Sequence, residues 1–121
     1  MSRLEYDTGS LPAALIARPH GDIDMAVTPG LKAALIDAVT EYSAGCLVVD
    51  LSCVEYIDSS GIELLFRLHG ALTGESVDLI VVAPPGTSAA RLLGMVALDD
   101  IGEIRGSLPE ALQTCGDPEV R

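Results

Sequence analysis

Residues 46–65 read CLVVDLSCVEYIDSSGIELL, and this stretch decides the fold. Its first part, Cys46–Leu51, is apolar apart from Asp50 and contains β-branched side chains. That pattern is typical of a central strand covered on both faces of a sheet. The polar turn Asp58-Ser59-Ser60-Gly61 follows a few residues later, and such a turn commonly precedes a helix.

The residues after this turn predict an amphipathic helix. Apolar side chains recur at helical spacing from Ile62 to about Leu72. Ser60 and Glu63 stand three residues apart before the apolar run. This spacing predicts a capping box, in which each side chain satisfies a free backbone N–H at the start of the helix.

The flanking sequence alternates in the same way between apolar runs and helical patterns. We therefore expect an α/β fold with a mixed β-sheet of four to five strands and about four short helices. Pro29 suits the first helical position, and Thr28 and Thr87 are predicted N-caps. The predicted strands are Leu4–Tyr6 paired with Leu11–Pro19 in a hairpin, Cys46–Leu51, Val77–Ala83 and Ile101–Arg105, and the predicted helices begin at Thr28, Ser60, Thr87 and Ser107.

Length and composition predict one domain. The chain has 121 residues, of which 49% are hydrophobic, and a mean hydropathy of +0.40, so it can bury a core of its own. We expect this single domain to span residues 1–121, with its core at about residues 11–115. Gly, Pro and charged residues at 116–121 predict a frayed C-terminal tail.

Charge and hydropathy exclude two classes of partner. A net charge of −11 repels nucleic acid backbones and anionic lipids, and the seven basic residues are scattered along the chain. No apolar run approaches the length of a membrane span. The N-terminal residues lack the pattern of a secretory signal, so we expect a cytoplasmic protein that binds another protein.

The cysteines and histidines suggest no cofactor or metal site. Cys46, Cys53 and Cys115 are odd in number and lack a CxxC spacing, so we interpret them as buried or idle thiols. Redox control through these cysteines is a weaker hypothesis. The two histidines, His20 and His69, have no recognisable catalytic context.

Enzyme motifs are also missing from the sequence. It contains no Gly-x-Ser-x-Gly nucleophile turn, no GxxxxGK[ST] phosphate loop and no GxGxxG dinucleotide motif. A phosphorylated receiver domain would need a lysine after a later strand, whereas the sole lysine is Lys32. We therefore predict no catalytic residues and no enzyme activity.

The Ser-Ser-Gly turn allows two interpretations. Before a helix it most often serves only as a cap. However, a hydroxyl just outside a helix N-terminus is exposed, and a phosphate there would lie beside the positive end of the helix dipole. A partner docked against Asp24, Asp58 and Ser59 would meet repulsion and a desolvation cost from that phosphate. Phosphorylation could then release the partner.

Two segments carry a family resemblance. VVDLSCVEYIDSSGIELL, with GDIDMAVTPGLKAAL upstream, resembles the anti-sigma-factor antagonists, bacterial proteins built on the STAS domain. The resemblance covers roughly Ala13–Leu112, and the Asp-Ser-Ser-Gly motif is its most specific mark. Gly21-Asp22-Ile23-Asp24 is similar to an acidic turn of the same family.

The resemblance implies a role for each residue of the turn. Ser59 matches the phosphoacceptor, Ser60 the neighbouring Ser or Thr, and Asp24 and Asp58 the acidic positions of the partner surface, which we expect to include Gly61. It implies that the unphosphorylated protein binds an anti-sigma factor that is also a serine kinase, and thereby frees a sigma factor. A PP2C-type phosphatase would restore binding.

An alternative hypothesis keeps the family but not the switch. In it, an unphosphorylated STAS module acts as a ligand sensor or as a fixed subunit of a signalling or transport complex. The intact Asp58-Ser59 pair favours the first hypothesis.

Overall fold

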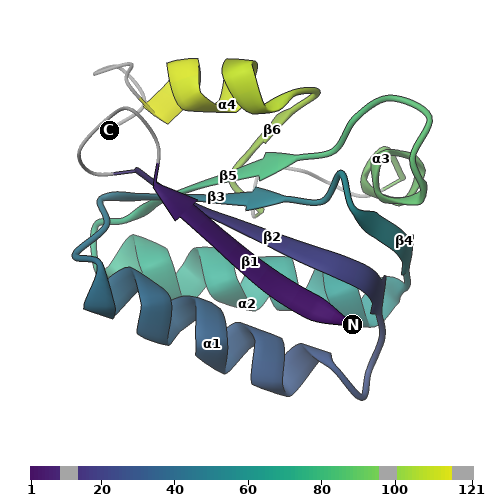
Figure 1. Cartoon of the computed structure of the whole chain (residues 1–121), viewed down its shortest axis with the longest axis horizontal. Coiled ribbons are helices and arrows are strands. Elements are labelled where there is room, and N and C mark those ends of the chain that lie inside the picture. Colours follow the sequence, from purple (N-terminus) through teal and green to yellow (C-terminus); the bar gives the residue numbers. More distant parts are fainter. Residues whose placement is uncertain (9–13, 96–100, 116–121) are drawn as a thin grey trace.

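A computed structural model describes residues 1–8, 14–95 and 101–115 of the chain, and Figure 1 shows its arrangement. Strands and helices alternate along most of the sequence, as the apolar runs predict. In chain order the elements are β1 (Arg3–Thr8), β2 (Ala14–Ile23), α1 (Thr28–Glu41), β3 (Cys46–Asp50), β4 (Val54–Ile57), α2 (Ser59–Gly74), β5 (Asp78–Val82), α3 (Ser88–Leu93), β6 (Glu103–Arg105) and α4 (Leu108–Cys115).

The sheet is mixed and six-stranded. Five strands follow the order β1-β2-β3-β5-β6, and the sixth, β4, pairs with β2. β1 runs antiparallel to β2, and every other pair is parallel. The predicted hairpin, α/β class and mixed sheet are therefore confirmed. The described sheet has one strand more than the predicted maximum, because β4 was not anticipated.

β2 joins two parts of the sheet because it is twice as long as its neighbour β3. Its first half pairs with β3 and its second half, from Gly21 to Ile23, pairs with β4. The register shifts between Gly21 and Asp22, where Gly21 adopts a φ of 94° that favours glycine. The prediction that the strand ends at Pro19 and is followed by a turn was thus wrong, because the bulge lets it continue to Ile23.

Helices cover both faces of the sheet, as Figure 1 shows, with α1 and α2 on one face and α4 on the other. The side chains of the strands alternate accordingly. Leu47 and Val49 belong to the core shared with α1 and α2, whereas Cys46 and Val48 belong to a smaller core shared with α4. The prediction that residues 46–51 form a strand covered on both faces is therefore confirmed.

All four helix starts agree with prediction within one residue, but two predicted caps do not form. Thr87 caps α3 by accepting a hydrogen bond from the Ala90 amide at 3.2 Å, as predicted. Thr28 was predicted to cap α1, but it lies inside the helix and the N-cap position is Val27, which forms no side-chain cap. Pro29 lies in the first turn, as the second helical residue rather than the predicted first one.

The predicted capping box at the start of α2 is also wrong. Asp58 is the N-cap, and its carboxylate accepts a hydrogen bond from the Ser60 amide at 2.9 Å. Glu63 instead pairs with Arg67 at 2.7 Å, one helical turn further along. Asp58 prevails because it directly follows β4 in an extended conformation, which is the geometry of an N-cap residue.

Two cysteines form a disulfide, contrary to the interpretation that all three are free thiols. Cys46, at the start of β3, is bonded to Cys115, the last residue of α4, and both are fully buried. The sequence separation of 69 residues hides this pairing, because only the packing of α4 on the sheet brings the two together. Cys53 is a free, half-buried thiol. The predicted tail at 116–121 lies outside the described residues.

Candidate functional site

The candidate site lies where two parallel strands end side by side. Ile23 of β2 pairs with Ile57 of β4, so Asp24 and Asp58 leave the same edge of the sheet next to each other. A hydrogen bond from the Asp58 amide to the Ile23 carbonyl, 3.3 Å long, joins the two chain segments there. The structure thus brings together the two acidic residues that the sequence predicts for the partner surface.

Each aspartate organises the turn that follows it. The Asp24 carboxylate accepts hydrogen bonds from the amides of Ala26 at 3.0 Å and Val27 at 3.2 Å, which shapes the loop into α1. The Asp58 carboxylate accepts from the Ser60 amide and from the Ser60 hydroxyl. Both carboxylates therefore stabilise the turns before α1 and α2, in addition to any role in binding a partner.

The hydrogen bonds at Asp58 keep its side chain ionised. The Ser60 hydroxyl is the main cause, with backbone amides adding to it, and together they lower the pKa of Asp58 below its ordinary 3.8. A group whose pKa falls on folding stabilises the folded state above its ordinary pKa. That contribution is lost as the pH drops through the lowered value, so the cap is fully formed at neutral pH.

Ser59 and Ser60 have different surroundings although they are neighbours. Ser60 is half-buried and its hydroxyl donates to Asp58. Ser59 is exposed in the first turn of α2, and no hydrogen bond joins its hydroxyl to another of the described residues. A hydroxyl in this position is accessible to a modifying enzyme, and its modification would break no existing hydrogen bond.

Gly61 lets α2 approach the ends of the two strands. A Cβ atom on Gly61 would collide with Cγ1 and Cδ1 of Ile57 and would lie 3.3 Å from Cγ2 of Ile23. Both isoleucines are buried, so the neighbouring core leaves little room for them to move. Gly61 is therefore needed for close packing under the site, and it is itself buried.

We expect Gly61→Ala to destabilise the protein by about 1–3 kcal/mol, the usual cost of overpacking a core. The control is Gly70→Ala on the same helix, where an added Cβ would meet no atom within 4 Å. Alanine favours helix more than glycine, so Gly70→Ala should be neutral or stabilising. Urea denaturation of both variants measures the difference, and equal stabilities would contradict the packing argument.

Two apolar side chains flank the aspartates at the surface. Met25 follows Asp24 and is 76% exposed, and Tyr56 lies two residues before Asp58 and is 53% exposed. Sequence reasoning missed both. No clear sequence signal marked Tyr56, because the residues of Val54–Ile57 do not alternate with the period of two that is typical of a strand.

Comparison with known proteins identifies the family. The family model of the STAS domain matches residues 6–111, most of the chain. The chain belongs to the STAS domain family. An anti-sigma factor antagonist from Mycobacterium paratuberculosis is 25% identical, with 95% of this chain and 96% of that chain aligned and a TM-score of 0.74.

Two further proteins are similar to this STAS domain. The Bacillus cell fate determinant SpoIIAA, in its phosphorylated form, shares the fold, with 14% identity over 93% of this chain and 99% of that chain and a TM-score of 0.66. A probable sulfate transporter 3.4 of Arabidopsis thaliana is 33% identical over 57 residues. That match covers 47% of this chain and 9% of the transporter.

The described part of the STAS domain adds two observations on partners. No helix in it is long and apolar enough to cross a membrane. Within residues 1–8, 14–95 and 101–115, no group of three or more His, Cys, Asp or Glu side chains is placed to hold a metal ion. Of the two histidines, His20 lies 3.0 Å from Glu5, in a charged cluster that also includes Arg3 and Arg18.

Proposed function

We propose that this STAS domain is a cytoplasmic anti-sigma factor antagonist controlled by phosphorylation of Ser59. Its unphosphorylated form binds an anti-sigma factor that is also a serine kinase, and so frees a sigma factor for transcription. The chain is a substrate of that kinase rather than an enzyme, and a PP2C-type phosphatase returns it to the binding form. The observation that carries the proposal is the exposed Ser59 hydroxyl beside the two aspartates.

The surroundings of Ser59 explain how a phosphate would act. On the free protein, the phosphate would lie in solvent at the N-terminus of α2, where the helix dipole favours negative charge. In a complex, the same phosphate would lose its water at a surface that already carries Asp24 and Asp58. The bound state is therefore destabilised more than the free state, and the partner is released.

The first test is mass analysis of the protein recovered from its own host. We expect a phosphoryl group on the tryptic peptide that contains Ser59, and we expect the Ser59→Ala variant to retain a kinase-like protein during purification. An unmodified Ser59 together with a partner that is not a kinase would overturn the proposal. Ser60→Ala is the neighbouring control, and its Ser59 should still accept phosphate.

We expect Ser59→Asp to weaken binding of the purified kinase by about 10–100-fold, since a carboxylate mimics only part of the phosphate charge. Ser59→Ala should bind like the unmodified protein. The control Ser43→Asp makes the same chemical change just after the C-terminal end of α1, whereas the N-terminal end of α1 lies near the site. It should leave the affinity for the kinase unchanged. Titration calorimetry measures all three, and a Ser59→Asp variant that binds as tightly as wild type would exclude charge repulsion as the switch.

A second candidate function rests on the likeness to the transporter segment. In it, the STAS domain is an unphosphorylated ligand sensor or a fixed subunit of a signalling or transport complex. The same mass analysis separates the two candidates. A constant partner and an unmodified Ser59 in all growth conditions would favour this one.

A further inference from the structure

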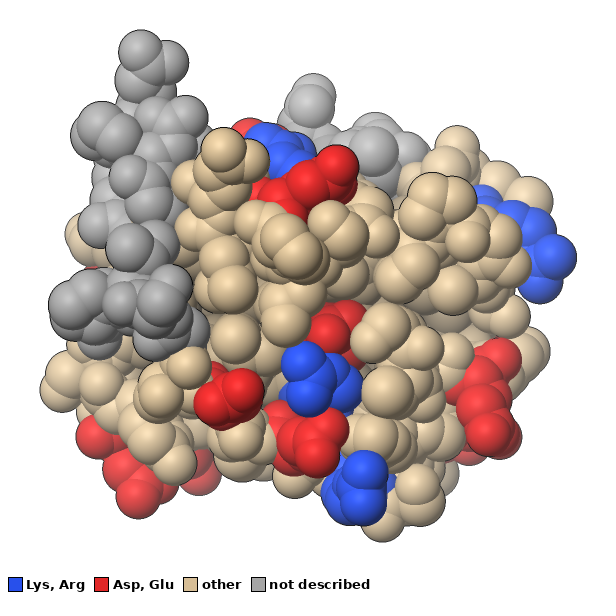
Figure 2. Space-filling model, turned by 45° about the horizontal axis from the view of Figure 1, so that its top comes forward, with Lys and Arg blue, Asp and Glu red and all other residues tan. Residues whose placement is uncertain are grey.

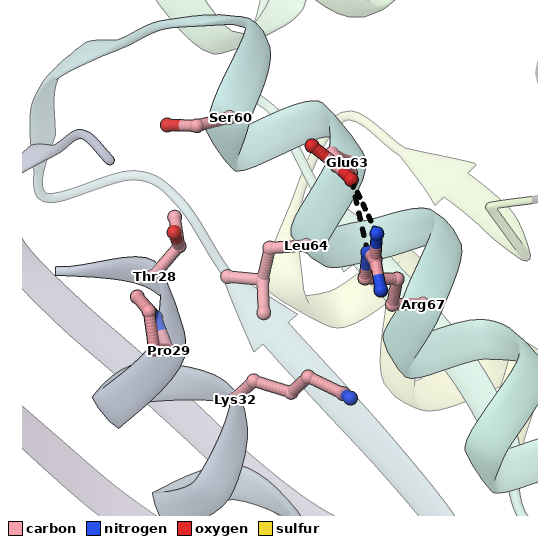
Figure 3. A pocket seen from close by; sticks show the side chains of 7 residues that line it. All are labelled: Thr28, Pro29, Lys32, Ser60, Glu63, Leu64 and Arg67. Carbon is pink, nitrogen blue, oxygen red and sulfur yellow. Dashed lines mark hydrogen bonds and ion pairs between the residues drawn. The ribbon is translucent and has the colours of Figure 1, made fainter. Parts of the chain in front are cut away.

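A groove between α1 and α2 begins at the same end of the molecule as Ser59, and Figure 3 shows its lining. The cavity has a volume of about 360 Å³. Leu64 points into it from α2, and Pro29 closes it at the start of α1. The lining residues are Thr28, Pro29, Lys32, Ser60, Glu63, Leu64 and Arg67.

The groove holds a positive charge that the protein itself does not neutralise. Lys32 is the sole lysine of the chain, and no ion pair joins it to another described residue. Arg67 differs, because its Nε and Nη2 atoms both donate to Glu63, at 3.0 and 2.7 Å. Figure 3 shows the ammonium group of Lys32 directed across the groove toward α2. The chain has a net charge of −11, so an ammonium group in a groove, with no ion pair to a described residue, stands out against a mostly acidic background.

The surroundings of Lys32 favour an anion. α1 begins at Thr28 and α2 begins at Ser59, so the positive ends of both helix dipoles lie near the groove. The Glu63 carboxylate is held by Arg67, which limits its competition for Lys32. A carboxylate entering the groove would therefore form a charge-assisted hydrogen bond with Lys32, while its aliphatic carbons contact Leu64 and Pro29.

We propose that this groove receives an acidic side chain of the partner protein, paired with Lys32. The inference rests on the proposed function and names a contact of the same interface. Ser60 belongs both to the predicted partner surface and to the groove lining, so the two are continuous. A protein occupant is favoured over a free anion because a protein could also contact the exposed Met25 and Tyr56 side chains at the same end, whereas a small anion in the groove could not.

The partner must then carry charges of both signs. Basic groups would face Asp24 and Asp58, and an acidic group would face Lys32. This arrangement fixes one orientation of the complex, because a rotated partner would place like charges together.

The test uses the full chain with Ser59→Ala as background and, as probe, the kinase identified with that variant and then purified. We expect Lys32→Gln to raise the Kd about 10-fold and Lys32→Glu to raise it more. The control is Ala71→Glu, which changes the net charge by the same amount as Lys32→Gln at an exposed position near the other end of α2. Its Kd should stay within two-fold of the parent, and thermal unfolding should show all variants folded.

The possible outcomes separate this inference from the proposed function. If Lys32→Gln binds the kinase as tightly as Ala71→Glu, the groove inference fails alone. If the Ser59→Ala protein binds no kinase, both fail. If acetate shifts the Lys32 NMR signals but Lys32→Gln leaves the kinase affinity unchanged, the groove is a small-anion site and the inference is overturned. Restoration of Lys32→Glu binding by an acidic-to-arginine change in the partner would identify the paired residue.

Discussion

Loss of the Cys46–Cys115 disulfide is expected to lower the free energy of unfolding by about 4 kcal/mol, from the entropy of the closed loop in the unfolded chain. The loop is long, with a sequence separation of 69 residues, and a longer loop gives a larger effect. Domains of this size are commonly stable by only about 5–15 kcal/mol. Cleavage of this bond should therefore remove a large part of the stability.

The loss should be felt first in α4. This helix is held on its face of the sheet by the disulfide, by a small apolar cluster and by a 2.9 Å hydrogen bond from Arg105 to Thr114. α1 and α2 share the much larger cluster on the other face. After reduction, the amides of α4 should exchange hydrogen faster than those of α1 or α2.

The measurement is guanidinium denaturation of the protein with and without a dithiol reductant. Cys115→Ser should match the reduced protein, and Cys53→Ser should remain sensitive to the reductant because Cys53 is free. Alkylation of the unfolded, unreduced protein should label one thiol. Labelling of all three would contradict the pairing. In a reducing compartment the disulfide would open, and α4 would depend on its apolar contacts and on its hydrogen bonds, among them the one from Arg105.

The strands and helices with long apolar patterns could be predicted from the sequence. The N-cap of α2 was predicted wrongly, because two neighbouring residues both suit that position. Both Asp58 and Ser60 are good N-cap residues, and the spacing of Ser60 and Glu63 favoured Ser60 as the cap. The end of β4 decides between them, because it leaves Asp58 extended. β4 itself was missed, since four residues with two exposed side chains give little pattern to detect.

The candidate site shows a similar division. The Asp-Ser-Ser-Gly motif and the family resemblance indicate Ser59 and its neighbours without any structure. The proximity of Asp24 and Asp58 could not be derived from spacing, because it depends on the pairing of β2 with the unpredicted β4. Lys32 was noticed only as the sole lysine. Its place in a groove depends on how α1 lies against α2, which no local pattern of residues reveals.

Asp50→Ala is expected to cost about 3 kcal/mol, because it removes one partner of a buried ion pair. The Asp50 side chain is almost fully buried, and Arg18 donates to it at 2.9 Å. Arg18 also contacts Glu5 at 3.1 Å, and these contacts raise the pKa of Arg18, with Asp50 the main cause. Figure 2 shows acidic and basic residues side by side near the middle of the molecular face that it presents.

The matched control is Glu5→Ala, which removes the other partner of Arg18 from a side chain that is 38% exposed. We expect a much smaller loss of stability than for Asp50→Ala, because water screens an ion pair at the surface. His20 and then Arg18 lower the pKa of Glu5 below its ordinary 4.5. The Glu5 contribution is thus present above that value and is lost as the pH falls through the lowered pKa. Equal losses for the two variants at pH 7 would contradict the difference in burial.

The Asp50 effect should also extend to the site. The Asp50 carboxylate accepts a hydrogen bond from the Ser52 amide at 3.0 Å, in the turn that leads from β3 to β4. β4 in turn places Tyr56 and Asp58 at the surface. Asp50→Ala should therefore weaken kinase binding in the Ser59→Ala background, whereas Glu5→Ala should not. A stability loss at Asp50 with unchanged affinity would mean that the pairing of β4 with β2 alone positions the site.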